Sequence, residues 1–540
     1  MSLVNISSFN GLRPITEPRL LGLDEATVAR NVRLTSGSIQ PLGGTKTLKA
    51  LKRVAPKTIW RYGTDPDEAD YWLEFADDTD VIHSPIPNDQ WARAYWTDGA
   101  KPKYAPNSLL LSGTGAYPGG SYDLGIPAPS TAISITAFTT PADAALAEKR
   151  IYTYTYVSAY GEEGPPATDS MIADVDPASP VTINGMTPPT GAYNITTIRI
   201  YRSSTVGSSA AYQFVDEIPV AQASYVDSKS QGQLGEVLMS EDWEAPPATL
   251  QGLKMMASGA LIGFEGNNVR LSEPNLPHAW PHRFTIDLPI VGIGVFRQSA
   301  VILTSGYPYI MTGVDPAAMT PERLEIPQAC LSKRSIVDAG DGVIYASPDG
   351  LVSIGSAGIN ILTLKLMTAQ QWMSYNPASM IGALHDNRYH AFYTKTDGTR
   401  GELIFDFSGQ GAIMTESSVS ADLPVTAAYA DARSDTLYIA KGANILRFNN
   451  GAPMTAVWRS RVFRTAYPVN MSVAAVDAES YPVTLRVYAE DQLRFTKTVN
   501  SSASFTLPSG FRASNWQFEI ESQSEVTRLR VATSMSELKS

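Results

Sequence analysis

Two histidines that stand four residues apart are the first residues whose spacing could support chemistry. The sequence has five histidines, and His278 and His282 have the spacing that two ligands of one metal ion take on a helix. Pro277 and Pro281 each precede one of them, and proline interrupts helical hydrogen bonding. This segment is therefore predicted to be a structural or interface loop, with no metal bound.

Two clusters of aspartates are candidates for a calcium site. They consist of Asp65, Asp67 and Asp70, and of Asp77, Asp78 and Asp80. A calcium loop of the EF-hand type needs alternating oxygen ligands, a central glycine and a terminal glutamate, and neither cluster has all three. We expect both clusters to be solvated turns beside strands.

Other signals of catalysis are weak. Ser347-Pro348-Asp349-Gly350 is similar to the aspartate turn of sialidase propellers but occurs once, and Asp-Gly is an ordinary hairpin turn. Cys330 is the single cysteine, so an intrachain disulfide is excluded, and its surroundings indicate a small buried thiol. No glycine-rich stretch leads into the Lys-Ser or Lys-Thr of a phosphate-binding loop. The sequence predicts a protein that is not an enzyme and has no catalytic residue, cofactor or metal.

Positive charge is sparse and dispersed. The 540 residues include 42 Lys and Arg against 53 Asp and Glu, which gives a formal net charge of -11. Such a chain does not attract a phosphate backbone as a whole and suits a surface past which DNA slides, although mild acidity also simply favours solubility. The densest basic groups, and hence the candidate interface or DNA-facing residues, are Lys333 and Arg334, and Arg459, Arg461 and Arg464.

The elements that must position these residues are predicted to be mostly β-strands. After residue 250, short apolar runs recur in pairs joined by Gly, Asn or Asp turns, at a spacing of about 40 residues that is typical of propeller blades. Each pair is expected to supply the middle strands of one blade, and a meandering β-domain without radial symmetry is the alternative. The pairs are 261–264 with 269–271, 300–304 with 309–311, 343–346 with 351–354, 389–393 with 402–406, and 436–440 with 445–448.

The complete pattern predicts an all-β fold with a β-propeller-like core, an inserted fibronectin-like β-sandwich and a C-terminal β-sandwich. Helices are expected only over 18–31 and 363–372, and neither a signal peptide nor a membrane span is expected. The expected divisions are an N-terminal arm with a short helix over 1–48, a first blade region over 49–138, the inserted sandwich over 139–247, further blades over 248–457 and the C-terminal sandwich over 458–540.

Several short motifs resemble segments of bacteriophage tail nozzle proteins, also called tail tubular proteins. The opening series begins with Phe9-Asn10-Gly11, continues through Ala29-Arg30-Asn31 and ends in a glycine turn over 36–42. Residues 154–163, followed by Ile200-Tyr201-Arg202, are similar to the inserted fibronectin-like domain of these proteins. Leu271-Ser272-Glu273-Pro274 with Pro277-His278-Ala279-Trp280-Pro281 is similar to a signature that recurs in them, and 462–538 is similar to their C-terminal domain.

The resemblance implies a structural subunit of a short phage tail, located in the virion and made in the cytoplasm of the host bacterium. It implies a closed ring, expected to be a hexamer, that continues the DNA channel below the head-to-tail adaptor, retains the packaged genome and lets it exit on infection. The expected partners are further copies of the chain, the adaptor ring, tail fibres or tail tip proteins, and double-stranded DNA bound without sequence specificity.

The chain departs from the longer members of this family in having few insertions, so its attachment of fibres could differ or be absent. The main alternative is a receptor-binding or adhesin-like propeller that recognises a glycan of the host surface. A cell-wall or polysaccharide hydrolase is a third and more distant alternative.

Overall fold

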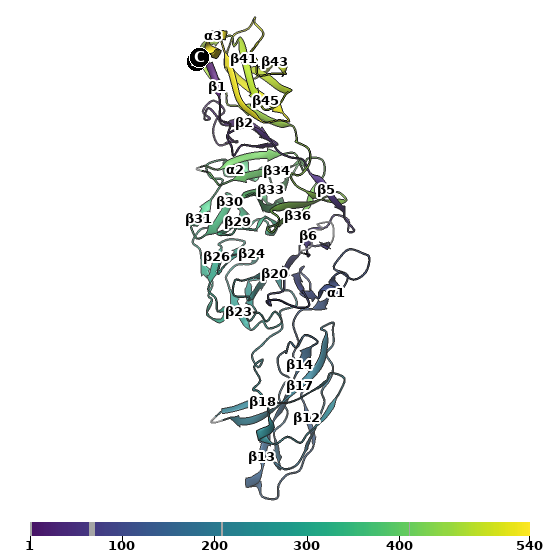
Figure 1. Ribbon diagram of the computed structural model, residues 1–540. Helices are drawn as coiled ribbons and strands as arrows, with labels where there is room; N and C mark the ends of the chain where they lie inside the picture. Colours follow the sequence, from purple (N-terminus) through teal and green to yellow (C-terminus); the bar gives the residue numbers. More distant parts are fainter. Residues whose placement is uncertain (1–2, 64–70, 207–208, 410, 540) are drawn as a thin grey trace. The chain divides into compact units, whose positions relative to one another are not determined.

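β-strands make up nearly all of the regular structure (Figure 1). The computed structural model describes residues 3–63, 71–206, 209–409 and 411–539. The α-helices of these residues are α1 (Asn107–Leu110), α2 (Ala369–Met373) and α3 (Met535–Lys539), and none of them is long and apolar enough to cross a membrane. The fold is all-β, as the sequence predicts.

The chain divides into two compact units, and the first consists of Met1–Asp78, Leu303–Pro308 and Leu324–Ser540. In this unit antiparallel sheets follow one another along the chain, each built from consecutive strands as in propeller blades. The first strands of these sheets lie together, because β28 contacts β32, β32 contacts β36 and β36 contacts β6. The strands are β28 (Val337–Asp338), β29 (Gly342–Ser347), β30 (Gly350–Gly355), β31 (Gly358–Ile361), β32 (Ile381–His385), β33 (Arg388–Thr394), β34 (Arg400–Asp406), β35 (Ile413–Ser417), β36 (Val425–Asp431), β37 (Thr436–Lys441), β38 (Asn444–Arg447), β6 (Thr58–Arg61) and β7 (Trp72–Phe75).

One of these sheets is completed by a strand from the other end of the chain. β5 (Lys46–Ala50) pairs with β38 and supplies the fourth strand of the sheet that begins with β36. Because its strands lie almost 400 residues apart in the sequence, the sheet ties the N-terminal arm to the blade region.

The second unit consists of Thr79–Ile302 and Tyr309–Arg323. It contains four-stranded sheets of the same kind, together with the inserted sandwich. The strands of these sheets are β8 (Asp80–His83), β9 (Ala94–Thr97), β10 (Lys103–Ala105) and β11 (Tyr122–Asp123), then β20 (Gln251–Met255), β21 (Leu261–Glu265), β22 (Asn268–Leu271) and β23 (His282–Thr285), and then β24 (Ile290–Phe296), β25 (Ser299–Thr304), β26 (Tyr309–Thr312) and β27 (Glu322–Arg323).

All five predicted hairpins are confirmed, and each forms the middle pair of a run of four strands. In four of the runs the strands are consecutive in the chain, and in the fifth the fourth strand is β5. The turn between β29 and β30 needs glycine, because Gly350 has a φ of +149° and a Cβ atom there would collide with the Thr363 hydroxyl. The prediction of a single blade over 49–138 is wrong. β9 pairs with β8 and β10 and does not join β7, so this segment forms two sheets.

The inserted domain is a sandwich of antiparallel sheets. One sheet has the order β12–β16–β19, another β14–β17–β18, and β13 pairs with β15. Tyr152, Tyr154 and Tyr156 alternate along β14 and all point into the core. The first strand begins at Ser134, before the predicted boundary at 139. The strands are β12 (Ser134–Ala137), β13 (Glu148–Arg150), β14 (Tyr152–Ser158), β15 (Ala173–Val175), β16 (Val181–Asn184), β17 (Ile195–Val206), β18 (Ser209–Pro219) and β19 (Ser224–Asp227).

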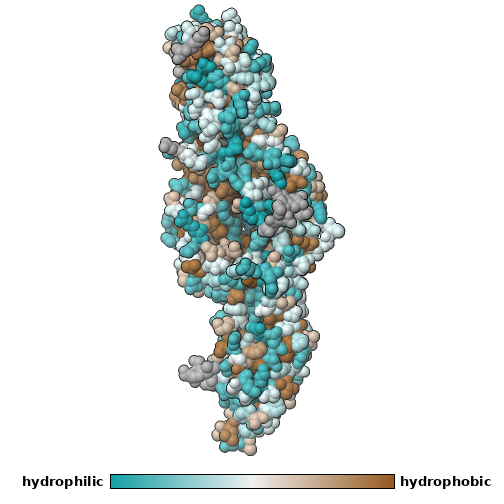
Figure 2. Space-filling view, in the orientation of Figure 1, coloured by the Kyte–Doolittle hydropathy of each residue, from teal (hydrophilic) through white to brown (hydrophobic). Residues whose placement is uncertain are grey.

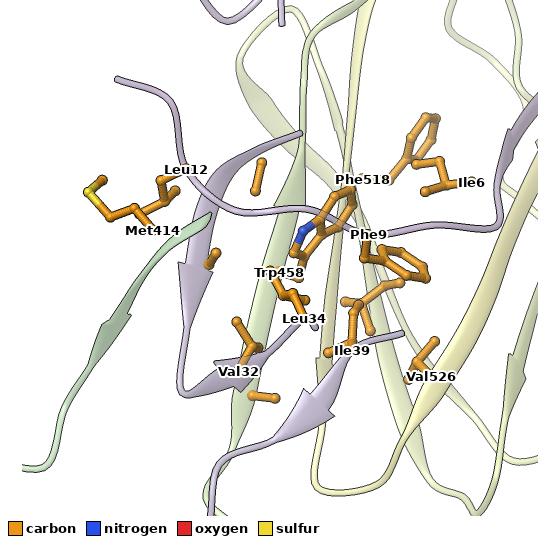
Figure 3. Close-up of a cluster of buried hydrophobic side chains, with 14 of the residues drawn as sticks. Ile6, Phe9, Leu12, Val32, Leu34, Ile39, Met414, Trp458, Phe518 and Val526 are labelled. Atoms are coloured by element: carbon orange, nitrogen blue, oxygen red, sulfur yellow. The ribbon is translucent and has the colours of Figure 1, made fainter. Parts of the chain in front are cut away.

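The C-terminal sandwich is completed by the N-terminal arm (Figure 3). β1 pairs with β46 at the edge of one sheet, and β2 lies between β35 and β39 in the other. Phe9 of the connecting segment is buried edge-on against Trp458, with ring centroids 4.9 Å apart. The strands are β1 (Leu3–Ile6), β2 (Ala26–Arg30), β39 (Ala456–Ser460), β40 (Phe463–Val469), β41 (Val473–Ala478), β42 (Val483–Ala489), β43 (Gln492–Val499), β44 (Phe505–Thr506), β45 (Ala513–Ser522) and β46 (Val526–Ala532).

The short helix predicted over 18–31 is absent, and the segment forms turns followed by β2. Ala26 and Ala29 are buried in the sandwich core while their backbone pairs with β39, so tertiary pairing outweighs the helical propensity of alanine. The helix predicted over 363–372 is shorter than expected. α2 begins after Thr368, whose hydroxyl accepts a hydrogen bond from the Gln371 amide, and 363–366 form a turn.

Candidate functional site

The basic residues singled out in the sequence are mostly held by partners within the chain. Lys333 and Arg334 lie in a short 3-10 turn, with Lys333 Nζ 3.6 Å from Asp78 Oδ2. The Arg334 side chain is half-buried, and its guanidinium donates to the carbonyl oxygens of Lys57 and Thr426. Burial lowers the pKa of Arg334, against the opposing charge of Asp78. This pair therefore ties neighbouring elements of unit 1 together.

The second basic group lies in the C-terminal sandwich. Arg459 donates to Glu519 and to the Tyr488 hydroxyl, with its guanidinium 4.0 Å from the centre of the Tyr488 ring. Arg461 donates to the carbonyl oxygens of Leu21 and Arg19 and so holds the N-terminal arm. Arg464, on β40, is exposed. The structure thus places the two basic groups on different elements. A role of these residues in contacts with other subunits or with DNA stays a prediction, and Arg464 is the residue whose exposed side chain suits such a contact best.

A hollow of about 530 Å³ opens among the first strands β28, β32 and β36 of three consecutive sheets. Among the described residues, its walls carry four aspartates and no lysine or arginine. Three of the aspartates stand at the end of a first strand or directly after it, where a tight turn begins. The four are Asp338, Asp386, Asp431 and Asp435.

Arginines that are not part of the lining hold two of these carboxylates. Arg61 of β6 donates to Asp431 Oδ2 at 2.9 Å, and both side chains are buried. Arg433 Nε lies 3.0 Å from Asp431 Oδ1, and Arg33 Nη2 lies 2.8 Å from Asp386 Oδ2. The Arg61 bond joins the sheet of β6 to the sheet of β36, so the aspartate is part of the packing between sheets as well as of the wall.

The ionised form of Asp431 is favoured in the fold. Burial opposes its ionisation, but hydrogen bonds from Arg433 and Arg61 and the charge of Arg433 outweigh burial and hold the pKa of Asp431 below its usual range. A carboxyl whose pKa is depressed by folding stabilises the protein above its unfolded pKa, and this stability is lost as the pH falls through the folded value.

We therefore expect Asp431→Asn to lower the free energy of unfolding of unit 1 by about 1.5–3 kcal/mol at pH 7, the range for hydrogen bonds to charged groups. The difference from the wild type should shrink as the pH falls below about 4, where the wild-type carboxyl is also protonated. Hydrogen exchange of β36 at pH 7 and in acid measures both effects. Asp386→Asn is the control, because Asp386 lines the same hollow with 40% of its side chain exposed and should cost less than about 1 kcal/mol. Equal losses in the two variants would contradict the assignment.

A buried histidine and glutamate lie behind the same wall. His390 Nδ1 is 2.7 Å from Glu402 Oε1, and the side chains are 2% and 0% exposed. His385, which lines the hollow, lies with its ring centroid 5.7 Å from that of His390, and burial, followed by the nearby His390, lowers the pKa of His385. A general base must reach a substrate. Because His390 and Glu402 are sealed in the core, the pair acts as a packed polar contact.

The other residues considered for chemistry are dispersed. Among the described residues no group of three or more His, Cys, Asp and Glu side chains could hold a metal ion. His282 Nε2 bonds Glu273 Oε1 at 3.0 Å, and Cys330 is buried, which raises the pKa of its thiol to about 12. Asp65, Asp67 and Asp70 lie outside the described residues.

Two of the motifs that resemble nozzle proteins meet in unit 2, where the inserted sandwich joins the sheet of β9. Arg93, directly before β9, has a side chain that is 1% exposed and bonds both Asp89 (2.8 Å) and Glu162 of the sandwich (2.6 Å). His278 Nδ1 of the other motif lies 3.9 Å from Glu162 Oε1. Burial lowers the pKa of His278, against the attraction of Glu162. A neutral histidine and a paired arginine thus lie where the sandwich joins the sheet of β9. We call this cluster, made of Asp89, Arg93, Glu162 and His278, the charged joint.

Sequence reasoning missed both the acidic hollow and this joint. The signal for the hollow was present, since Asp338, Asp386 and Asp431 occupy equivalent places in three successive repeats. Aligning the predicted hairpins on their turns would have revealed it. The joint gave no such signal, because Arg93, Glu162 and His278 are far apart in the chain.

The sheets and the hollow define the class of the protein, which is an all-β protein with a propeller-like core of repeated antiparallel sheets and β-sandwich domains. No family model and no curated protein sequence matches the chain.

Solved structures with partial similarity include Kluyvelomyces marxianus Hsv2, at 8% identity and a TM-score of 0.26 over 48% of this chain and 69% of that one. BBS1N in complex with ARL6DN matches at 11% identity and a TM-score of 0.24, over 58% and 92% of the two chains. A complex of S. cerevisiae Dbp5 with Nup159 and Gle1 matches at 8% and 0.24, over 52% and 91%. At these scores the similarity supports no conclusion about function.

Proposed function

We propose that this chain is a structural subunit of a bacteriophage tail nozzle. In this proposal six copies form a closed ring that continues the DNA channel below the head-to-tail adaptor, retains the packaged genome and lets it exit on infection. The protein acts through its interfaces. A head-to-tail contact repeated between copies forms a closed ring when the rotations from each copy to the next add up to a full turn.

The observation that carries the proposal is where the motifs that resemble nozzle proteins lie in the fold. Phe9-Asn10-Gly11 fills the core of the C-terminal sandwich, where the Trp458 indole donates to the Asn10 carbonyl at 3.0 Å and a Cβ atom on Gly11 would collide with the Met414 carbonyl. Glu162 and His278, from two further motifs, meet at the charged joint. Residues that hold a framework together are the ones that a shared architecture requires, and their positions support the proposal for that reason.

The charge distribution also supports passage of DNA. The net charge of -11 disfavours retention of phosphates by the surface of the chain as a whole. The hollow of about 530 Å³ is too small for a duplex whose major groove alone is about 12 Å wide. The proposed channel is therefore formed between copies of the chain.

The outer surface suits contacts of mixed polarity. On the face drawn in Figure 2, hydrophobic residues lie scattered among hydrophilic ones. Interfaces between proteins that also exist separately have a similar mixture of apolar and polar area. We propose that such surfaces contact the neighbouring copies, the adaptor ring, and tail fibres or tip proteins in the virion.

The mass of the purified protein tests this proposal. We expect native mass spectrometry, with and without a purified adaptor ring, to give a species of six times the subunit mass, and negative-stain microscopy to show a ring with a central opening. A protein that stays monomeric in the presence of the adaptor would rule out the nozzle assignment. A trimeric spike would instead favour the adhesin alternative.

A further inference from the structure

The C-terminal sandwich contains a groove of about 640 Å³, whose lining shares no residue with the acidic hollow or the charged joint. It is bounded by the end of β40, by the segment before β45 and by α3, near the C-terminal end of the chain (Figure 1). This volume lies within the range of about 300–1,000 Å³ that is usual for small-molecule sites. The polar and aromatic side chains of its lining include Thr465, Tyr467, Asn470, Arg512, Thr533 and Glu537.

The groove exists because the pairing of β40 with β45 is interrupted. Arg464 pairs with Asn515, but the next pair is Val469 with Ala513, so the residues between them loop away from the sheet. The Thr465 hydroxyl donates to the Tyr467 carbonyl at 2.8 Å and fixes the shape of the loop. The sequence thus builds one wall of the groove from a defined bulge.

One residue of the bulge exposes its aromatic ring to solvent. Tyr467 is 71% exposed, and neither a hydrogen bond nor a ring contact engages its side chain among the described residues. An exposed aromatic ring contributes little to the stability of the fold because it buries little area. Its flat face is, however, a suitable platform for an apolar face of a ligand.

Planar polar groups stand around this platform. Arg512 is exposed and its guanidinium has no partner within the described part of the chain. The Asn470 side-chain oxygen is buried and lacks a hydrogen-bond donor in the described residues. Glu537 of α3 accepts a hydrogen bond from the Thr533 hydroxyl at 2.6 Å. Arginine supplies only donors, the carboxylate only acceptors and the amide both, so together they can satisfy hydroxyl groups that donate and accept.

We infer that this groove binds a saccharide. A sugar ring has one face of C–H groups, which packs on an aromatic ring, and a rim of hydroxyls, which bond to planar side chains such as Arg, Asn and Glu. A phosphate ligand fits less well, because Glu537 opposes the single arginine. An apolar peptide fits less well, because the polar side chains would stay unpaired. The inference is independent of the ring assembly proposed above.

Binding of the full-length protein to an array of oligosaccharides from bacterial lipopolysaccharides and capsules tests the inference. The best-binding oligosaccharide is then titrated calorimetrically, and its component monosaccharides are added as competitors to separate recognition of a surface polymer from that of a free sugar. We expect Tyr467→Ala and Arg512→Ala each to weaken binding about tenfold or more, and Tyr467→Phe to change it about threefold or less. Arg494→Ala, an exposed arginine of β43 outside the groove, is the matched control and should bind as the wild type does.

Because Tyr467 and Arg512 are exposed, the melting temperature of these variants should stay within about 2 °C of the wild type, so that loss of binding reports on the groove. Wild-type protein that binds no saccharide on the array, or binding that survives both alanine substitutions, would overturn the inference. Either result leaves the mass of the assembly, and hence the proposed function, untouched.

Discussion

Replacing Phe9 by alanine is expected to lower the free energy of unfolding of the C-terminal sandwich by about 3–5 kcal/mol, the usual cost of removing a buried phenylalanine ring. Phe9 is 1% exposed and packs edge-on against Trp458, which is 0% exposed, in the cluster that Figure 3 shows. The substitution leaves a cavity between the N-terminal arm and the sandwich, so the arm should also detach more often.

Hydrogen exchange of β45 and β46 measures this effect locally, which matters because the chain has more than one folding unit. Amides of both strands should exchange faster in Phe9→Ala, and those of the inserted sandwich should not change. Leu20→Ala is the control in the same arm, since Leu20 is 65% exposed and its loss should cost less than about 0.5 kcal/mol. Wild-type exchange in the Phe9 variant would show that the arm does not stabilise this domain.

The second large effect is expected at Asp227, in the core of the inserted sandwich. Its Oδ2 accepts hydrogen bonds from Arg202 Nη1 and from the Tyr152 hydroxyl, both at 2.7 Å, and Arg150 Nη1 lies 4.0 Å away. Asp227 and Arg202 are fully buried. Asp227→Ala leaves two arginines in the core without this carboxylate, and removal of one partner of a buried ion pair costs about 3–5 kcal/mol.

Urea unfolding, followed by hydrogen exchange of β14 and β17, tests this expectation. Asp174→Asn is the control, because the Asp174–Lys149 pair in the same domain is mostly exposed and exposed pairs contribute about 1 kcal/mol or less. The double variant Asp227→Leu with Arg202→Met should recover part of the loss, since apolar replacements of a buried pair are often tolerated. An Asp227→Ala protein as stable as the Asp174→Asn control would disprove a stabilising role for the buried carboxylate.

The elements that were predicted well share one property, which is that their pattern is local. The five hairpins of the blade region show apolar runs on either side of a turn or loop, and both features are visible within 11 to 18 residues of sequence. The elements that were predicted poorly depend on distant partners. The segment over 18–31 has helical composition, but its last part forms the strand β2 because it pairs with β39, more than 400 residues away in the sequence.

The candidate sites follow the same rule. The basic residues were selected because they are close in sequence, yet Arg459 and Arg461 point to different internal partners. The groove around Tyr467 depends on a four-residue loop in the pairing of β40 with β45, and no local pattern reveals a break in register.

The sequence by itself determined the all-β class, the repeat of hairpins, the inserted and C-terminal sandwiches, and the acidic balance of the chain, because these follow from composition and from period-two patterning. The tertiary structure alone decided which distant strands complete each sheet, as β5 completes the sheet of β36. It also decided which charges meet, as Arg93 meets Glu162. Backbone hydrogen bonds and ion pairs form with whichever partner the packed core brings within reach, and that choice depends on the whole fold.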